Sequence, residues 1–275
     1  MKYNTLNDLS SFFVTKPLPC PYLDGLYERR LVAELSSVTN SRDLHETLSR
    51  VGFRRSHSMA YTPVCENCSA CIAIRSVSNE FIPNSSQRRI IKANQQVVGI
   101  ENDAKASIER FDLFSDYQQT RHPESDMATM DYNDFRALVE ETCVPTLIID
   151  FYDTHSEMLI AGCIVDVMDD GLSAVYSYFN PNMLSRSLGT FIILWLIDRA
   201  DQIGLDYVYL GYWVPGSPKM GYKANYAALE VFGNGTWSDI GDPDGYDAAL
   251  HPLSTAPIAE QVARITLPNG AQVVR

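Results

Sequence analysis

Three cysteines separated by two residues each, Cys65, Cys68 and Cys71, form the pattern in this chain that points most directly to chemistry. A fourth cysteine, Cys20, lies upstream of them. Four thiolates can hold a tetrahedral zinc ion or an iron–sulfur cluster, so we take these four residues as candidate metal ligands. The alternative is a turn of three buried thiols without metal. The two remaining cysteines lie far downstream, and we interpret them as core residues.

Basic residues gather between Arg50 and Lys92, where seven arginines and lysines face only two glutamates. This region contrasts with the whole chain, whose formal net charge is −12. The overall charge argues against nonspecific attraction to nucleic acids, and no DNA partner is expected. A guanidinium fork still binds phosphate well, so the region is a candidate phosphate contact, with an ordinary solvated face as the alternative. The residues concerned are Arg54, Arg55, Arg88, Arg89 and Lys92.

The chain between residues 176 and 223 predicts a strand, a turn of small residues, an apolar helix and a second strand. In such a βαβ unit, the backbone N–H groups at the start of the helix favour a bound anion. The turn reads Arg-Ser-Leu-Gly-Thr over residues 186–190. We therefore expect the backbone amides near Leu188 and Gly189 to donate to a developing oxyanion. Helix capping alone is the other explanation for small residues at this point.

Tyrosines cluster on the two predicted strands of this unit, among them Tyr178, Tyr209 and Tyr212. Ordinary sheet packing is one explanation, because tyrosine is favoured in strands. Buried phenol hydroxyls need partners, however, and so many of them suggest a groove that holds a polar ligand. The hydroxyl of Tyr178 is therefore a candidate catalytic donor, and Tyr209 and Tyr212 are candidate substrate contacts.

The elements that would position these residues belong to an α+β chain. In residues 1–100, apolar positions at helical spacing predict a helix over Leu26–Leu35, and a second helix begins at Ser85 or Ser86. Strands are predicted over residues 53–61 and 72–77, on either side of the cysteine loop. In the second part, the predicted helices are 103–119 and 131–141, and the predicted strands are 146–152, 158–168, 172–179 and 207–212.

Three regions follow from these patterns: a Cys-rich, basic N-terminal region (1–100), a second domain (101–240) and a loosely packed tail (241–275). The longest uninterrupted apolar run, Phe191–Ile197, is far shorter than the roughly 20 residues that span a bilayer. The first residues also lack the pattern of a signal peptide. A cytoplasmic protein without a membrane partner is expected.

Several colinear motifs resemble the arginyl-tRNA–protein transferase family. Its N-terminal part is similar at Cys20-Pro21-Tyr22-Leu23, Gly52-Phe53-Arg54-Arg55-Ser56, the cysteine segment 61–75 and Ser86-Gln87-Arg88-Arg89. Its C-terminal part is similar at Tyr178-Phe179-Asn180-Pro181, Ser187-Leu188-Gly189-Thr190, residues 207–213 and residues 220–223. The short length and the cysteine spacing look most like the bacterial branch, which transfers leucine.

This resemblance implies a GNAT-like acyltransferase fold over residues 101–240, with a smaller N-terminal α/β region that contains the cysteines. It also implies transfer of leucine from leucyl-tRNA to proteins with an N-terminal Asp or Glu, which marks them for degradation by the N-degron pathway. An aminoacyl ester is already activated, so the chemistry itself requires no cofactor. In this reading, Lys223 or Arg75 pairs with the acidic side chain of the recipient, and the basic region binds the tRNA acceptor arm.

Three other functions remain open at this point. The first is arginyl transfer to the same N-termini, since no single residue decides between the two amino acids. The second is a coenzyme-A-dependent N-acetyltransferase. GNAT enzymes hold coenzyme A with a Gln/Arg-x-x-Gly-x-Gly/Ala loop, and Phe191 replaces the last small residue here. The third is a non-enzymatic module that binds tRNA or acidic N-termini.

Overall fold

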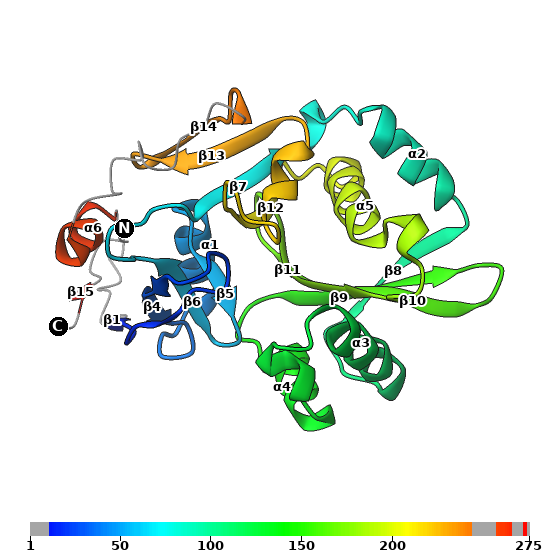
Figure 1. Ribbon diagram of the computed structural model, residues 1–275, viewed down its shortest axis with the longest axis horizontal. Helices are drawn as coiled ribbons and strands as arrows, with labels where there is room; N and C mark the ends of the chain where they lie inside the picture. The colour runs from blue at the N-terminus through cyan, green and yellow to red at the C-terminus, as the bar shows by residue number, and fades with distance from the viewer. Residues whose placement is uncertain (1–10, 244–256, 266–271, 274–275) are drawn as a thin grey trace, which may run out of the picture. The chain divides into compact units, whose positions relative to one another are not determined.

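The computed structural model describes residues 11–243, 257–265 and 272–273 (Figure 1). The chain forms two compact units: unit 1 comprises the chain up to Arg75 and from Leu210 onward, and unit 2 comprises Ser76–Tyr209. Most of the predicted tail, 241–275, lies outside the described residues. The two units divide the chain differently from the predicted regions 1–100 and 101–240. The reason is that the chain returns to unit 1 through the second half of one strand, β12 (Tyr207–Trp213).

Unit 1 contains a five-stranded sheet in the order β15-β1-β4-β6-β5 and a two-stranded sheet, β2-β3. Four further strands pair in the order β14-β13-β7-β12. Of these, β7 and β12 belong partly to unit 1 and partly to unit 2. Its strands are β1 (Ser11–Val14), β2 (Leu18–Pro19), β3 (Tyr27–Glu28), β4 (Arg30–Glu34), β5 (Arg54–Ser56), β6 (Met59–Pro63), β7 (Ile72–Val77), β13 (Leu229–Gly233), β14 (Thr236–Asp239) and β15 (Gln272–Val273). Its helices are α1 (Ser41–Arg50), the 3-10 helix η4 (Gly221–Asn225) and α6 (Ile258–Arg264).

Unit 2 is built on strands in the order β12-β11-β10-β9-β8. In Figure 1, α3 and α4 cover one face of this sheet, and α5 and α2 lie on the other. The strands are β8 (Val97–Asp103), β9 (Thr146–Asp153), β10 (Met158–Val167) and β11 (Gly171–Phe179). The helices are η1 (Ser78–Glu80), α2 (Ser85–Ala93), α3 (Ile108–Arg121), η2 (Asp126–Thr129), α4 (Tyr132–Glu140), η3 (Leu184–Arg186) and α5 (Leu188–Gln202).

The predicted βαβ unit is confirmed. Strand β11 pairs with β12 in parallel, with Gly171, Leu172 and Ser173 opposite Tyr207, Val208 and Tyr209. Helix α5 connects the two strands, as a parallel pair requires. The remaining strands of the unit pair antiparallel, so the sheet is mixed and the predicted α+β class is confirmed.

The helix predicted over Leu26–Leu35 is wrong, because these residues form β3 and β4. Strand β4 pairs with β1 on one side and β6 on the other, and Leu31, Val32 and Ala33 are all buried. A strand buried on both faces loses the alternation of apolar and polar residues, and its apolar run can then match helical spacing by chance.

No helix in the described part of the chain has both the length and the apolar character needed to cross a membrane.

Candidate active site

Cationic and phenolic side chains from several segments of unit 1 come together in one place, which we call the cation–phenol cluster. The guanidinium of Arg30 lies 4.6 Å from the ring centre of Tyr61, and that of Arg54 lies 6.0 Å from the ring centre of Tyr212. The two rings are 6.2 Å apart. The cluster consists of Tyr22, Arg30, Arg54, Tyr61, Tyr212 and Lys223.

Gly211 allows Arg54 to enter this cluster. Its φ of +78° suits glycine, and a Cβ atom at this position would overlap the Arg54 guanidinium. Nη1 of Arg54 donates to the carbonyl of Leu210 at 3.4 Å. Arg54 therefore lies directly on the backbone of β12.

Lys223 is buried below the same strand. Its Nζ donates to the carbonyls of Leu210 at 2.7 Å and Tyr212 at 2.9 Å. Burial lowers the pKa of Lys223 well below its ordinary value, and the charge of Arg54 lowers it further, whereas Cys71 acts in the opposite direction. A neutral amine needs only two acceptors for its two protons, which matches this geometry.

Tyr212 anchors the cluster from β12. Its hydroxyl lies 3.0 Å from the carbonyl oxygens of both Gly52 and Tyr61, which share its one proton. The ring is almost completely buried, and burial raises the pKa of its hydroxyl well above the ordinary value. Tyr212 thus holds β12 to the N-terminal strands of unit 1.

Arg30, Tyr22 and Tyr61 keep donors that no protein group uses. Nη2 of Arg30 pairs with Glu28 at 2.5 Å, but its buried Nε has no partner among the described residues. The hydroxyls of Tyr22 and Tyr61 also lack a partner within the part of the chain that the structure describes. Burial is the main reason why the pKa of Tyr22 is raised, so this phenol is a neutral donor at ordinary pH.

The four predicted metal ligands lie within electrostatic reach of one another in unit 1. Burial raises the pKa values of Cys65 and Cys71, and the charges of Cys20 and Cys68 raise both of them further. As the side chains are placed, no group of three or more His, Cys, Asp or Glu in the described residues is arranged to hold a metal ion. The thiols suit zinc or an iron–sulfur cluster by their chemistry, but as placed they do not surround a common metal position.

Among the predicted catalytic groups, Tyr178 does not meet Leu188 and Gly189. The Tyr178 ring packs edge-on against Phe114 of α3 and Phe135 of α4. Leu188 and Gly189 begin α5, which lies on the other face of the sheet (Figure 1). The Tyr178 hydroxyl is buried without a partner in the described chain, and burial raises its pKa above the ordinary value.

The start of α5 has an unusual cap. Ser187 occupies the N-cap position with φ +50° and makes no side-chain capping hydrogen bond. The amides of the first turn therefore have no side-chain acceptor from Ser187, so the predicted donors Leu188 and Gly189 keep their place as candidates.

Two predicted substrate contacts already have partners. Arg75 binds Glu230 through Nη2 at 2.7 Å and stacks 4.4 Å from the ring centre of Trp237. In unit 2, the hydroxyl of Tyr209 donates to Asp170 at 3.2 Å. Both side chains are buried, and these contacts account for them structurally.

The predicted tRNA contacts differ in exposure. Arg88, Arg89 and Lys92 are exposed on α2, whose first turn contains no acidic residue. Arg54 belongs to the cation–phenol cluster, and Arg55 is buried and donates to the carbonyl of His57 at 2.8 Å. Only the α2 residues of this set offer an open basic surface.

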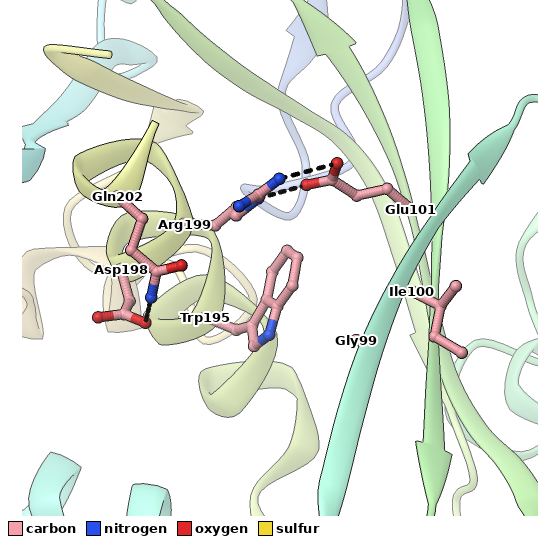
Figure 2. Close-up of a pocket in the computed structure, with 7 residues that line it drawn as sticks. All are labelled: Gly99, Ile100, Glu101, Trp195, Asp198, Arg199 and Gln202. Carbon is pink, nitrogen blue, oxygen red and sulfur yellow. Dashed lines mark hydrogen bonds and ion pairs between the residues drawn. The ribbon is translucent and has the colours of Figure 1, made fainter. Parts of the chain in front are cut away.

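A groove of about 430 Å³ lies between α5 and β8 in unit 2 (Figure 2). The Trp195 ring lies against Gly99, where a Cβ would approach to 2.6 Å. The polar groups of the groove already bind one another: Arg199 forms an ion pair with Glu101, and Gln202 donates to Asp198. We therefore assign no ligand to it.

Sequence reasoning missed Arg30, Tyr22 and Tyr61 as site residues. Tyr22 and Tyr61 lie in segments that resemble the family, where the nearby cysteines gave the clearer chemical signal. Arg30 lies in the segment that was predicted to be a helix, and this prediction did not place it beside either tyrosine.

Comparison with known proteins gives consistent matches. The family model described as "Arginine-tRNA-protein transferase, N terminus" matches residues 18–89, and "Arginine-tRNA-protein transferase, C terminus" matches residues 109–233. A protein of Jannaschia sp. (strain CCS1) named aspartate/glutamate leucyltransferase is 48% identical over 267 residues, which cover 97% of this chain and 93% of that protein. A protein of the same name from Paramagnetospirillum magneticum is 50% identical over 234 residues, covering 85% and 95%.

Similarity to solved structures is more distant. The structure of L-PGS from Bacillus licheniformis superposes with a TM-score of 0.41 at 10% identity, covering 52% of this chain and 45% of that one. FemX superposes with a TM-score of 0.40 at 7% identity, covering 64% and 61%. Both scores are too low to say more about this fold.

Proposed function

The chain belongs to the arginine-tRNA–protein transferase family, and we propose that it transfers leucine from leucyl-tRNA to the N-terminal Asp or Glu of proteins. The observation that carries this proposal is the identity of about half of all residues, over nearly the full length, with relatives named aspartate/glutamate leucyltransferase. The chain is thus an aminoacyltransferase. Its product would be marked for degradation by the N-degron pathway, and we infer that it acts in the cytoplasm, where charged tRNA is available.

The reaction needs positioning more than activation. The neutral α-amine of the recipient attacks the ester carbonyl carbon of leucyl-tRNA, an N–C bond forms, and the C–O bond to the ribose breaks. The amine loses a proton and the ribose oxygen gains one, so no external reagent is needed. With a pKa near 7.7–8.0, roughly a tenth of the amine is neutral at pH 7. Holding the two reactants together therefore supplies much of the rate.

The developing oxyanion needs hydrogen-bond donors. The backbone amides of Leu188 and Gly189 support this role, because Ser187 leaves the first turn of α5 without a side-chain cap. The exposed basic residues of α2 support contact with tRNA phosphates.

The decisive experiment mixes the protein with leucyl-tRNA or arginyl-tRNA and peptides that begin with Asp, Glu, Asn or Lys. Mass spectrometry should detect one added leucine on the Asp and Glu peptides only. Addition of arginine would move the protein to the arginyl-transferring branch. If no peptide gains mass from either tRNA, the transferase proposal fails.

The four cysteines are proposed to bind zinc or an iron–sulfur cluster that has no part in the transfer step. Burial disfavours the thiolates of Cys65 and Cys71, and a bound cation would offset this cost by replacing the thiol protons. Metal analysis of protein purified without oxygen should find zinc or iron in near-stoichiometric amount, and Cys68→Ser should lower that content. Absence of both metals from the wild-type protein would contradict the assignment.

A further inference from the structure

The cation–phenol cluster brings the guanidinium groups of Arg30 and Arg54 together with the buried amine of Lys223, and Glu28 pairs with Arg30. Lys223 and Arg54 donate to backbone carbonyls of β12, so these two side chains hold the strand in place. Arg30 is therefore the cation of the cluster that remains available to a ligand.

Arg30 is presented in a way that suits a planar anion. Its guanidinium stacks 4.6 Å from the Tyr61 ring centre, which fixes the plane of the fork. Its side chain keeps 31% of its surface exposed, and its Nε lacks a partner in the described residues. A buried donor without an acceptor costs free energy, and a bound anion would remove that cost.

Two phenols supply further donors beside this guanidinium. The Tyr61 ring lies 4.6 Å from the Arg30 guanidinium, and Tyr22 interacts electrostatically with both groups. Neither hydroxyl has an acceptor among the residues that the structure describes. The Nε of Arg30 and the two hydroxyls are hydrogen-bond donors, and they match a ligand that presents two acceptor oxygens.

The pairing of Glu28 with Arg30 shows that this guanidinium accommodates a carboxylate. The Glu28 carboxylate already lies 2.5 Å from Nη2, so a carboxylate is compatible with this environment. A polyanionic tRNA backbone would instead favour exposed cations such as Arg88, Arg89 and Lys92 on α2.

Resting on the function proposed above, we propose that Arg30, Tyr22 and Tyr61 bind the side-chain carboxylate of the recipient's N-terminal Asp or Glu. Arg30 supplies the charge, and the two hydroxyls donate to the carboxylate oxygens. Asparagine and glutamine place an amide at the same point, and its NH2 group would face these donors instead of accepting from them, so they are rejected. The residues previously predicted for this role, Arg75 and Lys223, serve unit 1 structurally.

The test measures peptide binding and transfer for four variants. Arg30→Gln should weaken binding of an Asp peptide by about a hundredfold, because it removes one partner of a charge pair. Tyr61→Phe and Tyr22→Phe should each weaken it by about tenfold and keep the rings in place. Arg30→Lys should recover part of the loss. In each case the preference for Asp over Asn peptides should fall, and the affinity for leucyl-tRNA should stay unchanged.

Matched controls are available in the same segment. Tyr27→Phe removes a hydroxyl from an exposed tyrosine, and Arg29→Gln removes the charge of the neighbouring arginine. Both should keep the wild-type preference. Thermal melts identify any variant that fails to fold. If Arg30→Gln fails to fold, the two Tyr→Phe variants still test the proposal.

The outcomes separate this inference from the proposed function. Folded variants that keep the Asp preference would overturn the inference, even with leucine transfer intact. A loss of leucyl-tRNA affinity with an unchanged peptide preference would also overturn it and assign the cluster to RNA. If wild-type protein binds Asp peptides through Arg30 without transferring leucine, the carboxylate site stands and the proposed function fails.

Discussion

A single glycine controls the placement of one cation in the cation–phenol cluster. Gly211→Ala should destabilise the protein by about 2–4 kcal/mol, because the new Cβ overlaps Arg54 at a backbone angle that disfavours side chains. Urea unfolding monitored by circular dichroism measures this loss. Gly216→Ala is the matched control, since Gly216 also has positive φ but nothing within 4 Å. It should cost only about 1 kcal/mol.

The buried amine of Lys223 should make stability depend on pH. Its pKa is lowered by folding, so the unfolded chain binds the proton more tightly than the folded one between that lowered value and 10.5. Stability should therefore rise with pH in this window, by up to about 1.4 kcal/mol per pH unit. Comparing the urea midpoints of wild type and Lys223→Met at each pH isolates the contribution of Lys223 to the pH dependence of stability. Equal slopes for both proteins would show that Lys223 stays charged.

At the scale of elements, α2 combines an open basic surface with a firmly fixed start. Asn84 and Gln87 form a capping box, which positions Arg88, Arg89 and Lys92 on a well-defined helix. Changing all three to Gln should weaken binding of leucyl-tRNA and flatten its dependence on salt by about one unit of slope per lost phosphate contact. Filter binding over a salt series measures both. Arg121→Gln at the end of α3 should leave the slope unchanged.

The sequence patterns predicted the elements of unit 2 better than those of unit 1. Strands β9 to β12 and helices α2 to α5 lie close to their predicted positions, since each is long and strongly patterned. The strand predicted over residues 53–61 is instead a hairpin of β5 and β6, turned at His57 with φ +53°. Strands of three to five residues are too short to show a clear alternation of polar and apolar residues. A turn at a histidine with positive φ is also hard to predict from sequence.

The candidate site was only partly visible in the sequence for the same reason. Tyr212 and Lys223 were chosen, but the partners of Tyr212 lie more than 150 residues away along the chain, and only tertiary pairing brings them together. Arg30 was hidden by the wrong helix prediction. Arg75 was chosen for its charge, and no sequence pattern revealed that Glu230 and Trp237 occupy it.

At the scale of the whole molecule, the two units differ in how many segments of the chain form them. Unit 2 is one continuous segment, Ser76–Tyr209, whereas unit 1 is assembled from both ends of the chain. A fragment of residues 76–209 should therefore melt cooperatively on its own, and residues 1–100 should show no transition. Differential scanning calorimetry of the two fragments checks this. A cooperative transition for 1–100 would show that β12 and β13 are dispensable for the N-terminal strands.

The discontinuity of unit 1 also determines when this protein becomes active during its synthesis. On the ribosome, Arg54 emerges well before Gly211, and all of unit 2 is made in between, which takes on the order of 10 s at typical elongation rates. Until then the nascent chain has no backbone on which Arg54 and Tyr61 can settle. A truncated translation product therefore never assembles the cation–phenol cluster, and only a nearly complete polypeptide can tag other proteins for destruction.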